Sequence, residues 1–271
     1  MWLLFSIVGG ISVYFSLRYA WWKPAISYRN PRILMYHMIK KHTHGKFRGL
    51  RVAPEMFERQ IRYLKENGWY FATMSELANR KTRLPEKTVV ITFDDGYEDN
   101  YTHAFPILKK YQAKATLYIV VDRHEREWSG NRKIKNRTGE LMREPKLSDG
   151  QIREMARSGL FEIGSHTLTH PNLPTLSLEE KRKEICHSKK IIEEYFYIRC
   201  NAFCYPFGLF DERDVTLVEK AGYTSATTTQ QGIEELAHAD MLRLRRITVS
   251  GKDNFFAFKM KLRTGKRGVF K

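Results

Sequence analysis

The most constraining stretch of this sequence is ITFDDGYEDN, residues 91–100, where an apolar run ends at two adjacent acids. Residues 88–93 are β-branched or aromatic throughout, which predicts a buried parallel strand. Neighbouring side chains of a strand point to opposite faces, so Asp94 and Asp95 would diverge if the strand continued. Gly96 lets the backbone bend, and the two carboxylates can then serve one site in different roles. An isolated Asp-Asp-Gly is more often a plain acidic turn, so the interpretation depends on the rest of the chain.

A second strand end carries two histidines. The sequence EIGSHTLTH, residues 162–170, places His166 and His170 just after an expected strand. One carboxylate with two histidines is the ligand set of a metal site that keeps an open coordination position. The alternative is a pair of surface or helix-capping histidines, which the acidic stretch makes the less favoured interpretation.

Strand-like and helix-like segments alternate along the chain. We expect strands over residues 32–36, 69–72, 88–93, 115–121, 161–164, 201–205, 223–226 and 242–249. This alternation predicts an α/β fold of parallel βαβ units closed into a barrel. The C-terminal strand ends of such a barrel carry the chemistry. The candidate site residues all follow strand ends: His37, Asp94, Asp95, His166 and Pro206.

A long basic insertion interrupts this alternation over residues 122–146. Its aromatic and basic members include Trp128, Arg132, Lys133, Lys135 and Arg137. A loop of this length is usually functional or mobile.

The N-terminal segment is apolar. No charge occurs between Trp2 and Leu17, and aromatic residues follow Arg18. A helix of about 20 residues spans a bilayer core, and an arginine beside an aromatic belt suits the membrane interface. We therefore expect a transmembrane anchor over residues 1–22, followed by a linker over residues 23–30. The alternative is a cleaved signal peptide, but the segment lacks the basic start and the clear small-residue cleavage site of one.

The charges that follow this segment bear on its orientation. They are Arg18, Lys23, Arg29 and Arg32. The positive-inside rule would keep that side cytoplasmic. We expect a single-pass protein with its folded domain outside the cytoplasm, but the sequence does not settle the side.

The formal net charge of +17 at pH 7 favours an anionic partner, such as an acidic glycan or a phospholipid surface. No RRM, KH or C2H2 pattern is recognisable, so we expect no nucleic-acid partner.

Residues 251–271 are predicted to be a basic helix and tail. The run contains Lys259, Lys261, Arg263, Lys266, Arg267 and Lys271, with Phe270 nearby. It can contact anionic headgroups or form a solvated tail, and the sequence favours neither.

Three motifs occur in the order TFDDG, SHTLTH and YPFG, and together they resemble the polysaccharide deacetylases with a NodB homology domain, carbohydrate esterase family 4. The resemblance covers residues 31–250. The start of this region, ILMYHMI followed by F-x-x-Q-I-x-Y-L-K-x-x-G, is similar to the subgroup that deacetylates poly-β-1,6-N-acetylglucosamine. In that subgroup the last motif of the family stands at the start of the domain, as in a circular permutation.

The resemblance implies a distorted (β/α)7 TIM-like barrel and a divalent metal ion. Zinc is the expected ion, with cobalt, nickel or iron as alternatives. Asp95, His166 and His170 would hold it, and Asp94 would be the general base. The chemistry agrees, because a metal with an open position polarises an acetyl carbonyl and acidifies water, and a neighbouring carboxylate can take the proton.

The third motif departs from the family pattern. Cys204 stands where the family has an arginine that orients the catalytic aspartate, and Phe207 stands where it has a tyrosine. The resemblance implies an oxyanion and substrate region at Tyr205 and Phe207, with the Phe207 N–H as the donor. We group Arg246 with this region and consider it a substitute for the missing arginine, or else a solvated basic strand end.

His37 is the predicted general acid. The stretch TVSGKDNF after the last strand offers no histidine where the classical family keeps its acid. In the permuted subgroup that histidine follows the first strand, as His37 does here. Histidine suits the role because its pKa lies near neutrality. The alternative is a histidine that only caps the strand.

These features predict a membrane-anchored, metal-dependent hydrolase that removes N-acetyl groups from amino sugars of a polysaccharide or cell-surface glycan. One rival is a deacetylase or deformylase of a lipid-linked sugar, which would use the same site. The other is a catalytically inactive barrel that only binds glycan. The sequence does not predict an oligomeric state.

Overall fold

The computed structural model describes residues 2–79, 81, 83–133 and 136–269, with side chains from residue 9 onward. Its strands are β1 (Arg32–Tyr36), β2 (Tyr70–Ala72), β3 (Thr88–Phe93), β4 (Ala115–Ile119), β5 (Phe161–Ser165), β6 (Ala202–Cys204), β7 (Ser225–Gln231) and β8 (Leu244–Thr248). Its α-helices are α1 (Trp2–Tyr19), α2 (Pro54–Glu66), α3 (Met74–Ala78), α4 (Phe105–Tyr111), α5 (Glu140–Arg143), α6 (Asp149–Arg157), α7 (Leu178–Arg182), α8 (Ser188–Phe196), α9 (Glu212–Lys220) and α10 (Phe255–Thr264).

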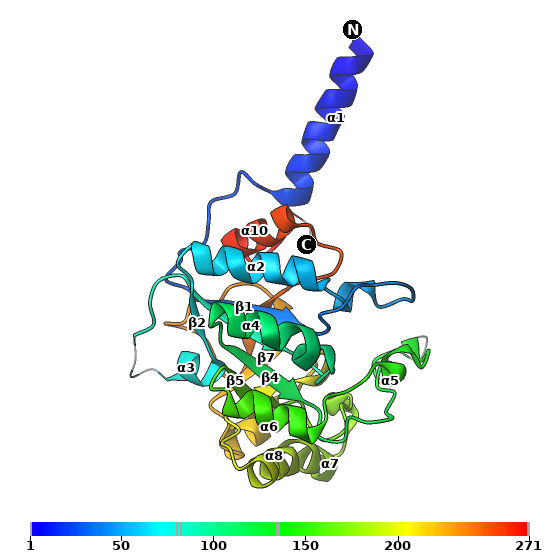
Figure 1. The fold of residues 1–271 in the computed structure, drawn as a ribbon, viewed down its shortest axis with the longest axis vertical. Coiled ribbons are helices and arrows are strands. Elements are labelled where there is room, and N and C mark those ends of the chain that lie inside the picture. The colour runs from blue at the N-terminus through cyan, green and yellow to red at the C-terminus, as the bar shows by residue number, and fades with distance from the viewer. Residues whose placement is uncertain (1, 80, 82, 134–135, 270–271) are drawn as a thin grey trace.

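The strands close into a parallel barrel. The order is β1-β8-β7-β6-β5-β4-β3, and β1 also pairs with β3, so seven of the described strands form a ring. The remaining strand, β2, pairs with the first half of β3, and β4 pairs with its second half. Helices cover the outside of the barrel (Figure 1). The predicted TIM-like barrel is confirmed.

The central strand β3 is buried along its whole length, as its composition predicts. It lies between β1 on one edge and β4 on the other, and both pairings are parallel. The helix α2 covers this part of the barrel with Phe57, Ile61 and Leu64, which recur at helical spacing and are fully buried. Because β3 is held on both edges, the residues that follow it start from a fixed position.

The C-terminal segment folds onto the barrel. Phe258 and Leu262 of α10 belong to the main apolar core, and the backbone carbonyl of Leu262 accepts a hydrogen bond from the buried Arg32 side chain at 2.8 Å. Lys261 is buried and pairs with Asp253. This charge of the predicted basic run is therefore neutralised within the fold, while Phe270 and Lys271 lie outside the described residues.

The N-terminal helix α1 extends away from the barrel, and its base lies beside α10 (Figure 1). Within the part of the chain that the structure describes, no helix combines the length and the apolarity needed to cross a membrane. The transmembrane anchor expected over residues 1–22 is therefore not supported.

Candidate active site

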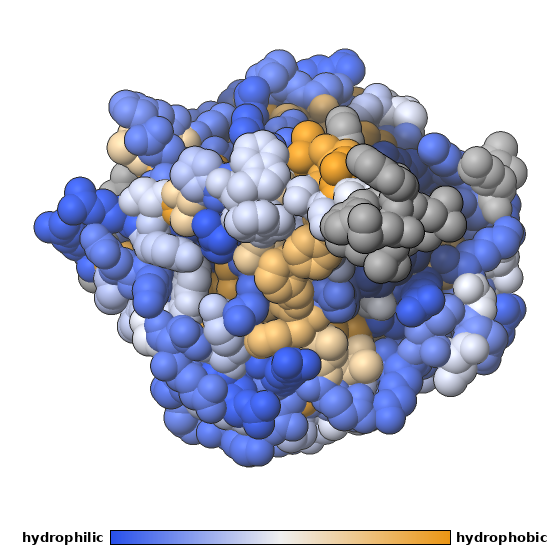
Figure 2. All heavy atoms as spheres, turned by 90° about the horizontal axis from the view of Figure 1, so that it is seen from above, coloured by the Kyte–Doolittle hydropathy of each residue, from blue (hydrophilic) through white to orange (hydrophobic). Residues whose placement is uncertain are grey.

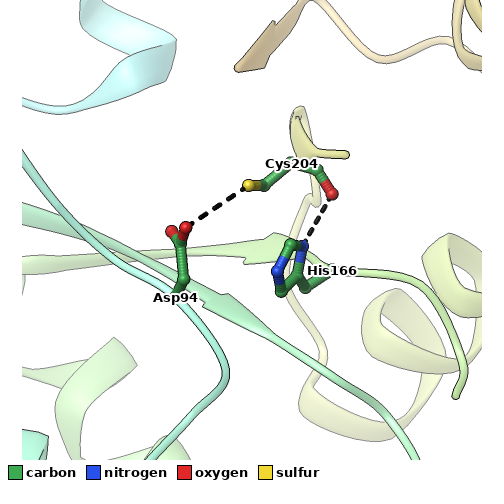
Figure 3. A group of neighbouring side chains, drawn as sticks. All are labelled: Asp94, His166 and Cys204. Atoms are coloured by element: carbon green, nitrogen blue, oxygen red, sulfur yellow. Dashed lines mark hydrogen bonds between the residues drawn. The ribbon is translucent and has the colours of Figure 1, made fainter. Parts of the chain in front are cut away.

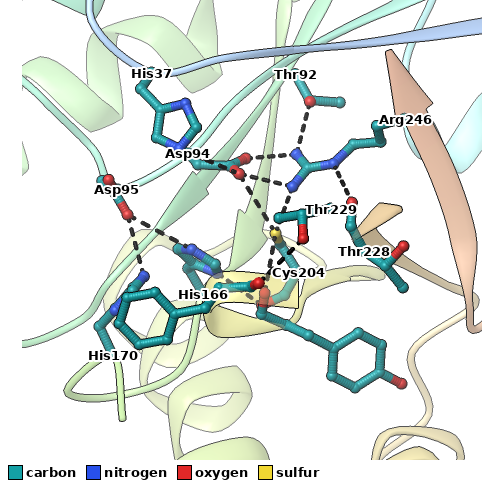
Figure 4. A network of polar contacts seen from close by, with 12 residues as sticks. His37, Thr92, Asp94, Asp95, His166, His170, Cys204, Thr228, Thr229 and Arg246 are labelled. Carbon is teal, nitrogen blue, oxygen red and sulfur yellow. Dashed lines mark hydrogen bonds and ion pairs between the residues drawn. The ribbon is translucent and has the colours of Figure 1, made fainter. Parts of the chain in front are cut away.

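The turn after β3 separates the two acids. Asp95 and Gly96 adopt positive φ angles of 76° and 72°, in the left-handed region that residues other than glycine seldom enter. The predicted bend is therefore present, and it begins at Asp95 itself. As a result, the Asp94 carboxylate faces Arg246 and the Asp95 carboxylate faces two histidines (Figure 4).

Asp95, His166 and His170 converge on one point. The Nε2 atoms of His166 and His170 lie 3.6 and 3.4 Å from Oδ1 of Asp95. His166 follows β5, and its Nδ1 atom hydrogen-bonds the carbonyl oxygen of Cys204 at 2.7 Å. That bond leaves Nε2 as the free ring nitrogen on the side of Asp95, an arrangement that metal-binding histidines commonly use.

His170 is fixed by its neighbours. Its φ angle is +56°, and its N–H donates to Oγ1 of Thr167 at 3.0 Å. The indole of Trp128 stacks on the imidazole with ring centres 5.2 Å apart, and the Phe207 ring meets it edge-on at 4.5 Å. The ring therefore has little freedom to turn away from Asp95.

The protonation states also suit a metal site. Desolvation tends to raise the pKa of Asp95, but the hydrogen bond with His170 and the neighbouring imidazoles outweigh it and hold that pKa well below its usual range. Burial lowers the pKa of His170. A carboxylate that is ionised and an imidazole that is neutral near pH 7 are the forms that bind a divalent ion.

A second group of candidate ligands lies next to the first. It consists of Asp94, His166 and Cys204 (Figure 3). Burial raises the pKa of the Cys204 thiol, so the thiolate that a metal requires is disfavoured. Both carboxylate oxygens of Asp94 already accept hydrogen bonds from Arg246. The group of Asp95, His166 and His170, whose donor atoms lie within 4.8 Å of one another, is therefore the better metal site.

Arg246 is buried beside Asp94, so the alternative of a solvated basic strand end is wrong. Its guanidinium binds Asp94 through two hydrogen bonds of 2.7 Å, and Arg246 is fully buried. Its other donors reach Oγ1 of Thr92, the carbonyl of Thr228 and the sulfur of Cys204, at 3.0, 2.9 and 3.2 Å. All five N–H groups are thus engaged, so Arg246 lies behind Asp94 and has no donor left for a substrate.

The Arg246 contact also sets the charge of Asp94. Desolvation tends to raise the pKa of this buried carboxyl, but the charge and hydrogen bonds of Arg246 outweigh it and leave that pKa below its ordinary value. Asp94 is consequently ionised at neutral pH, which is the form that a general base requires.

His37 lies across from Asp94. It follows β1, which pairs in register with β3, so Tyr36 is opposite Phe93 and the next residues face each other. The distance from His37 Nε2 to Asp94 Oδ2 is 4.0 Å. Burial lowers the pKa of His37, and the charge of Asp94 offsets part of that effect.

One cavity of about 330 Å³ at the C-terminal ends of the strands is lined by His37, Asp94, Asp95, His166 and His170. The basic insertion contributes part of its wall with Trp128, Ser129, Arg132, Asn136 and Leu141. The length of this loop indicated a functional or mobile segment, but nothing in the sequence predicted that Trp128 stacks on His170, a candidate metal ligand. Which residues of a long loop reach a site depends on its path, which no local pattern reports.

Tyr205 and Phe207 lie in the cavity wall, as predicted. Phe207 has a φ angle of +57°, and its carbonyl accepts a hydrogen bond from Thr229 Oγ1. The hydrogen bonds of this turn are donated by the N–H groups of Gly208 and Leu209, and Phe207 N–H donates none of them. The hydroxyl of Tyr205 donates to the carbonyl of Leu242 at 3.0 Å, so this residue presents its ring to the cavity.

Comparison with known proteins identifies the family. The family model described as polysaccharide deacetylase matches residues 81–226. A Bacillus subtilis protein named as a polysaccharide deacetylase, YxkH, is 33% identical over 221 residues, which cover 80% of this chain and 71% of the relative. The chain belongs to the polysaccharide deacetylase family. This polysaccharide deacetylase is therefore an enzyme, a hydrolase that acts on carbon–nitrogen bonds other than peptide bonds.

A relative from Staphylococcus aureus is named for the activity of the predicted subgroup, and solved structures agree with the family. Poly-beta-1,6-N-acetyl-D-glucosamine N-deacetylase of Staphylococcus aureus is 27% identical over 213 residues, 70% of this chain and 68% of the relative. The deacetylase PplD of Streptococcus pyogenes, solved with acetate, has a TM-score of 0.69 and 27% identity and covers 85% of this chain and 95% of its own. BC0361, a polysaccharide deacetylase from Bacillus cereus, has a TM-score of 0.72 and 29% identity, with coverage of 86% and 69%. The resemblance read from the three motifs is thus confirmed.

Proposed function

We propose that this polysaccharide deacetylase is metal-dependent and removes the N-acetyl group from an N-acetylated amino sugar of a cell-surface glycan. One observation carries the proposal. Three side chains of the kind that bind metal ions lie in the same cavity as Asp94, and Arg246 holds Asp94 in place. The named activity of the Staphylococcus aureus relatives supports the choice of substrate class.

The donor set suits a divalent ion. Two imidazole nitrogens and one carboxylate are the ligands that zinc favours in catalytic sites, and cobalt, nickel or iron accept the same set. Asp95, His166 and His170 would hold the ion. When bound, such an ion acts as a Lewis acid toward the acetyl carbonyl and makes water more acidic.

The chain itself supplies the proton transfers. Asp94, ionised and held in place by Arg246, accepts the proton of the attacking water. The N–H of Phe207 can donate to the oxyanion that forms from the carbonyl. His37 in its imidazolium form gives a proton to the leaving amine; burial lowers the pKa of His37, which makes that form a stronger acid but a less populated one near neutral pH, and the charge of Asp94 opposes this effect. Acetate and a free amino sugar are the products.

The test is acetate release from a panel of N-acetylated oligosaccharides, with and without a chelator. Chelation should remove activity before it unfolds the barrel, and His166→Ala or His170→Ala should abolish tight binding of one ion. Metal content of the purified variants is the direct measurement. Full stoichiometric metal in both variants would show that the site is assigned to the wrong residues.

The same assay separates the rival functions. Acetate release by the wild type from lipid-linked sugars alone would favour a lipid-linked substrate. Binding of glycan by the wild type without acetate release would favour the inactive barrel.

We also propose that the face around α1 and α10 attaches the enzyme to an anionic membrane surface. Its exposed aromatic residues include Trp21, Trp22 and Phe256, and Lys252 and Lys266, which flank α10, are also exposed. Figure 2 looks down on this face and shows apolar surface near its middle, surrounded by hydrophilic residues. Buried Lys261 takes no part, because Asp253 already pairs with it.

Charge reversal on this face should weaken vesicle binding. The double variant Lys252→Glu/Lys266→Glu should bind anionic vesicles less at low salt, because each charge near such a surface contributes about 1 kcal/mol. The difference should vanish as salt rises. Cosedimentation of the full chain measures it, with Lys190→Glu/Lys220→Glu on α8 and α9 as the control. Equal binding of vesicles by the two double variants would exclude attachment through Lys252 and Lys266. Vesicle binding that does not change with salt would exclude it as well.

A further inference from the structure

The acidic stretch continues past the two catalytic-site carboxylates with Asp99 and Asn100, which the proposed mechanism does not use. Asn100 begins a π-helical turn, Asn100–Ala104. Single π turns are rare and occur frequently at functional sites. Here the turn packs against the segment that follows β1, residues 37–39.

Asp99 and Asn100 bind the backbone on both sides of Met38. The Asn100 Nδ2 group donates to the carbonyl of His37 at 2.7 Å and to Oδ1 of Asp99 at 3.0 Å. The same Oδ1 accepts the N–H of Ile39 at 2.7 Å. Asn100 is fully buried, so its bond to His37 does not compete with water. One amide and one carboxylate oxygen therefore fix the backbone that carries His37.

The rest of this segment is held as well. His103 of the same π turn bonds the carbonyl of Ile39 through Nδ1 at 2.8 Å. On its other side, Met38 exchanges backbone hydrogen bonds with Leu50 and Val52, at 3.0 and 2.9 Å. The segment thus has a defined place between the π turn and the loop before α2, and the bond from Asn100 acts on the carbonyl of His37 itself.

We propose that Asp99 and Asn100 are positioning residues that hold His37 beside Asp94, where it can reach the leaving group. A general acid works only within hydrogen-bond reach of the leaving group. His37 and Asp94 directly follow the paired strands β1 and β3, their Nε2 and Oδ2 atoms are 4.0 Å apart, and both residues line the same cavity. The π turn that follows Asp94 in the chain therefore also fixes the position of His37, which faces Asp94. This inference rests on the proposed role of His37 in deacetylation.

A comparison of leaving groups tests it. The enzyme, supplied with a divalent ion, is assayed on an N-acetylated oligosaccharide and on an activated aryl acetate. The phenolate of the ester leaves without a proton, so the ester does not need the acid. Asn100→Ala should lower kcat on the amide by on the order of 10²-fold, the effect of a displacement of about 1 Å, and should change kcat on the ester little.

The double variant gives an independent criterion. His37→Ala should lose about 10²- to 10⁴-fold on the amide and little on the ester, as expected for removal of a general acid. If Asn100 acts only through His37, the pair His37→Ala/Asn100→Ala should be no slower than His37→Ala alone. Additive losses would overturn the proposal.

Two further variants separate positioning from general damage. Asp99→Asn keeps an oxygen acceptor for the Ile39 N–H and should retain activity, whereas Asp99→Ala should reproduce the amide-specific loss. Desolvation raises the pKa of Asp99 to about 7, so a neutral side chain suits this place. Thr102→Ala is the control, because Thr102 lies in the same π turn and its hydroxyl reaches only the carbonyl of Glu98 among the described residues.

Equal losses on amide and ester in Asn100→Ala would make this residue structural and overturn the proposal. If Asn100→Ala does not fold, the pair Asp99→Ala and Asp99→Asn decides in the same way, since absence of rescue by asparagine also overturns it. A wild type without deacetylase activity, or a His37→Ala variant impaired equally on both substrates, would instead show that the proposed function or the role of His37 has failed.

Discussion

Replacing Arg246 with methionine should both destabilise the fold and abolish turnover. The buried carboxylate of Asp94 would lose its counter-charge and two hydrogen bonds of 2.7 Å. Removing one partner of a buried ion pair typically costs about 3–5 kcal/mol of folding free energy. Turnover would disappear because desolvation, no longer opposed by Arg246, would favour the protonated form of Asp94.

The defect should depend on pH in a defined direction. In the wild type the folded-state pKa of Asp94 is lowered, so its contribution to stability is present above the unfolded-state pKa and is lost as pH falls through the folded value. Without Arg246, burial makes the ionised carboxyl unfavourable, and protonation relieves that cost. The difference in unfolding free energy should therefore be largest near neutrality and shrink in acid.

Chemical denaturation at several pH values measures this difference. Arg245→Met is the matched control, because Arg245 is the adjacent residue of β8 and its side chain is 53% exposed in an ion pair with Glu234. Exposed pairs of this kind contribute about 0–1 kcal/mol. If Arg246→Met were as stable as Arg245→Met at neutral pH, the pairing with Asp94 would not matter to the fold.

Asp94→Asn should keep the metal ion and lose turnover. The amide oxygen can still accept a hydrogen bond from Arg246, but an amide has no basicity with which to take a proton from water. Removal of a general base typically lowers the rate by about 10²- to 10⁴-fold. The ion should stay, because Asp95, His166 and His170 are untouched.

Metal content and kcat are measured on the same preparation, after the folded fraction has been determined. Asp95→Asn serves as the counterpart and should lose the ion, since it weakens a ligand. Near-normal turnover in Asp94→Asn would remove this residue from the mechanism, and loss of the ion would make it a ligand.

Much of the site could be predicted because it depends on local sequence. The run of residues 88–93 defines the buried strand by composition, and the acids follow it directly. His166 and His170 stand four residues apart after a strand end, so short-range geometry already places them near each other. The barrel then follows from the repeated alternation of strands and helices.

The partner of Asp94 could only be named as a hypothesis. Arg246 is 152 residues further along the chain, and its side chain reaches Asp94 only because β8 lies next to β1 in the closed ring. The cysteine at position 204 indicated that some other residue must orient Asp94, but no local pattern identifies which one. Long-range pairing of this kind is a property of strand register.

In the C-terminal run, residues 251–271, the composition concealed a segment that packs on the core. Its charges suggested a surface or a solvated tail, yet Phe258 and Leu262 stand four residues apart and mark an apolar helix face that packs on the core. Lys261 lies beside that face and is paired within the fold. A count of charges alone does not distinguish a lysine on the outer face of a helix from one that is buried.

The closure of the ring by β1 and β8 also determines when the catalytic centre can exist during synthesis. His37 follows the first strand of the barrel and Arg246 lies in the last, and both side chains reach the turn after β3. A nascent chain that has not yet released β8 from the ribosome would have Asp94 without its counter-charge and a barrel open along β1. Contacts this distant in sequence form slowly, because loop closure must precede them. The ionised base should therefore be among the last features of the enzyme to form.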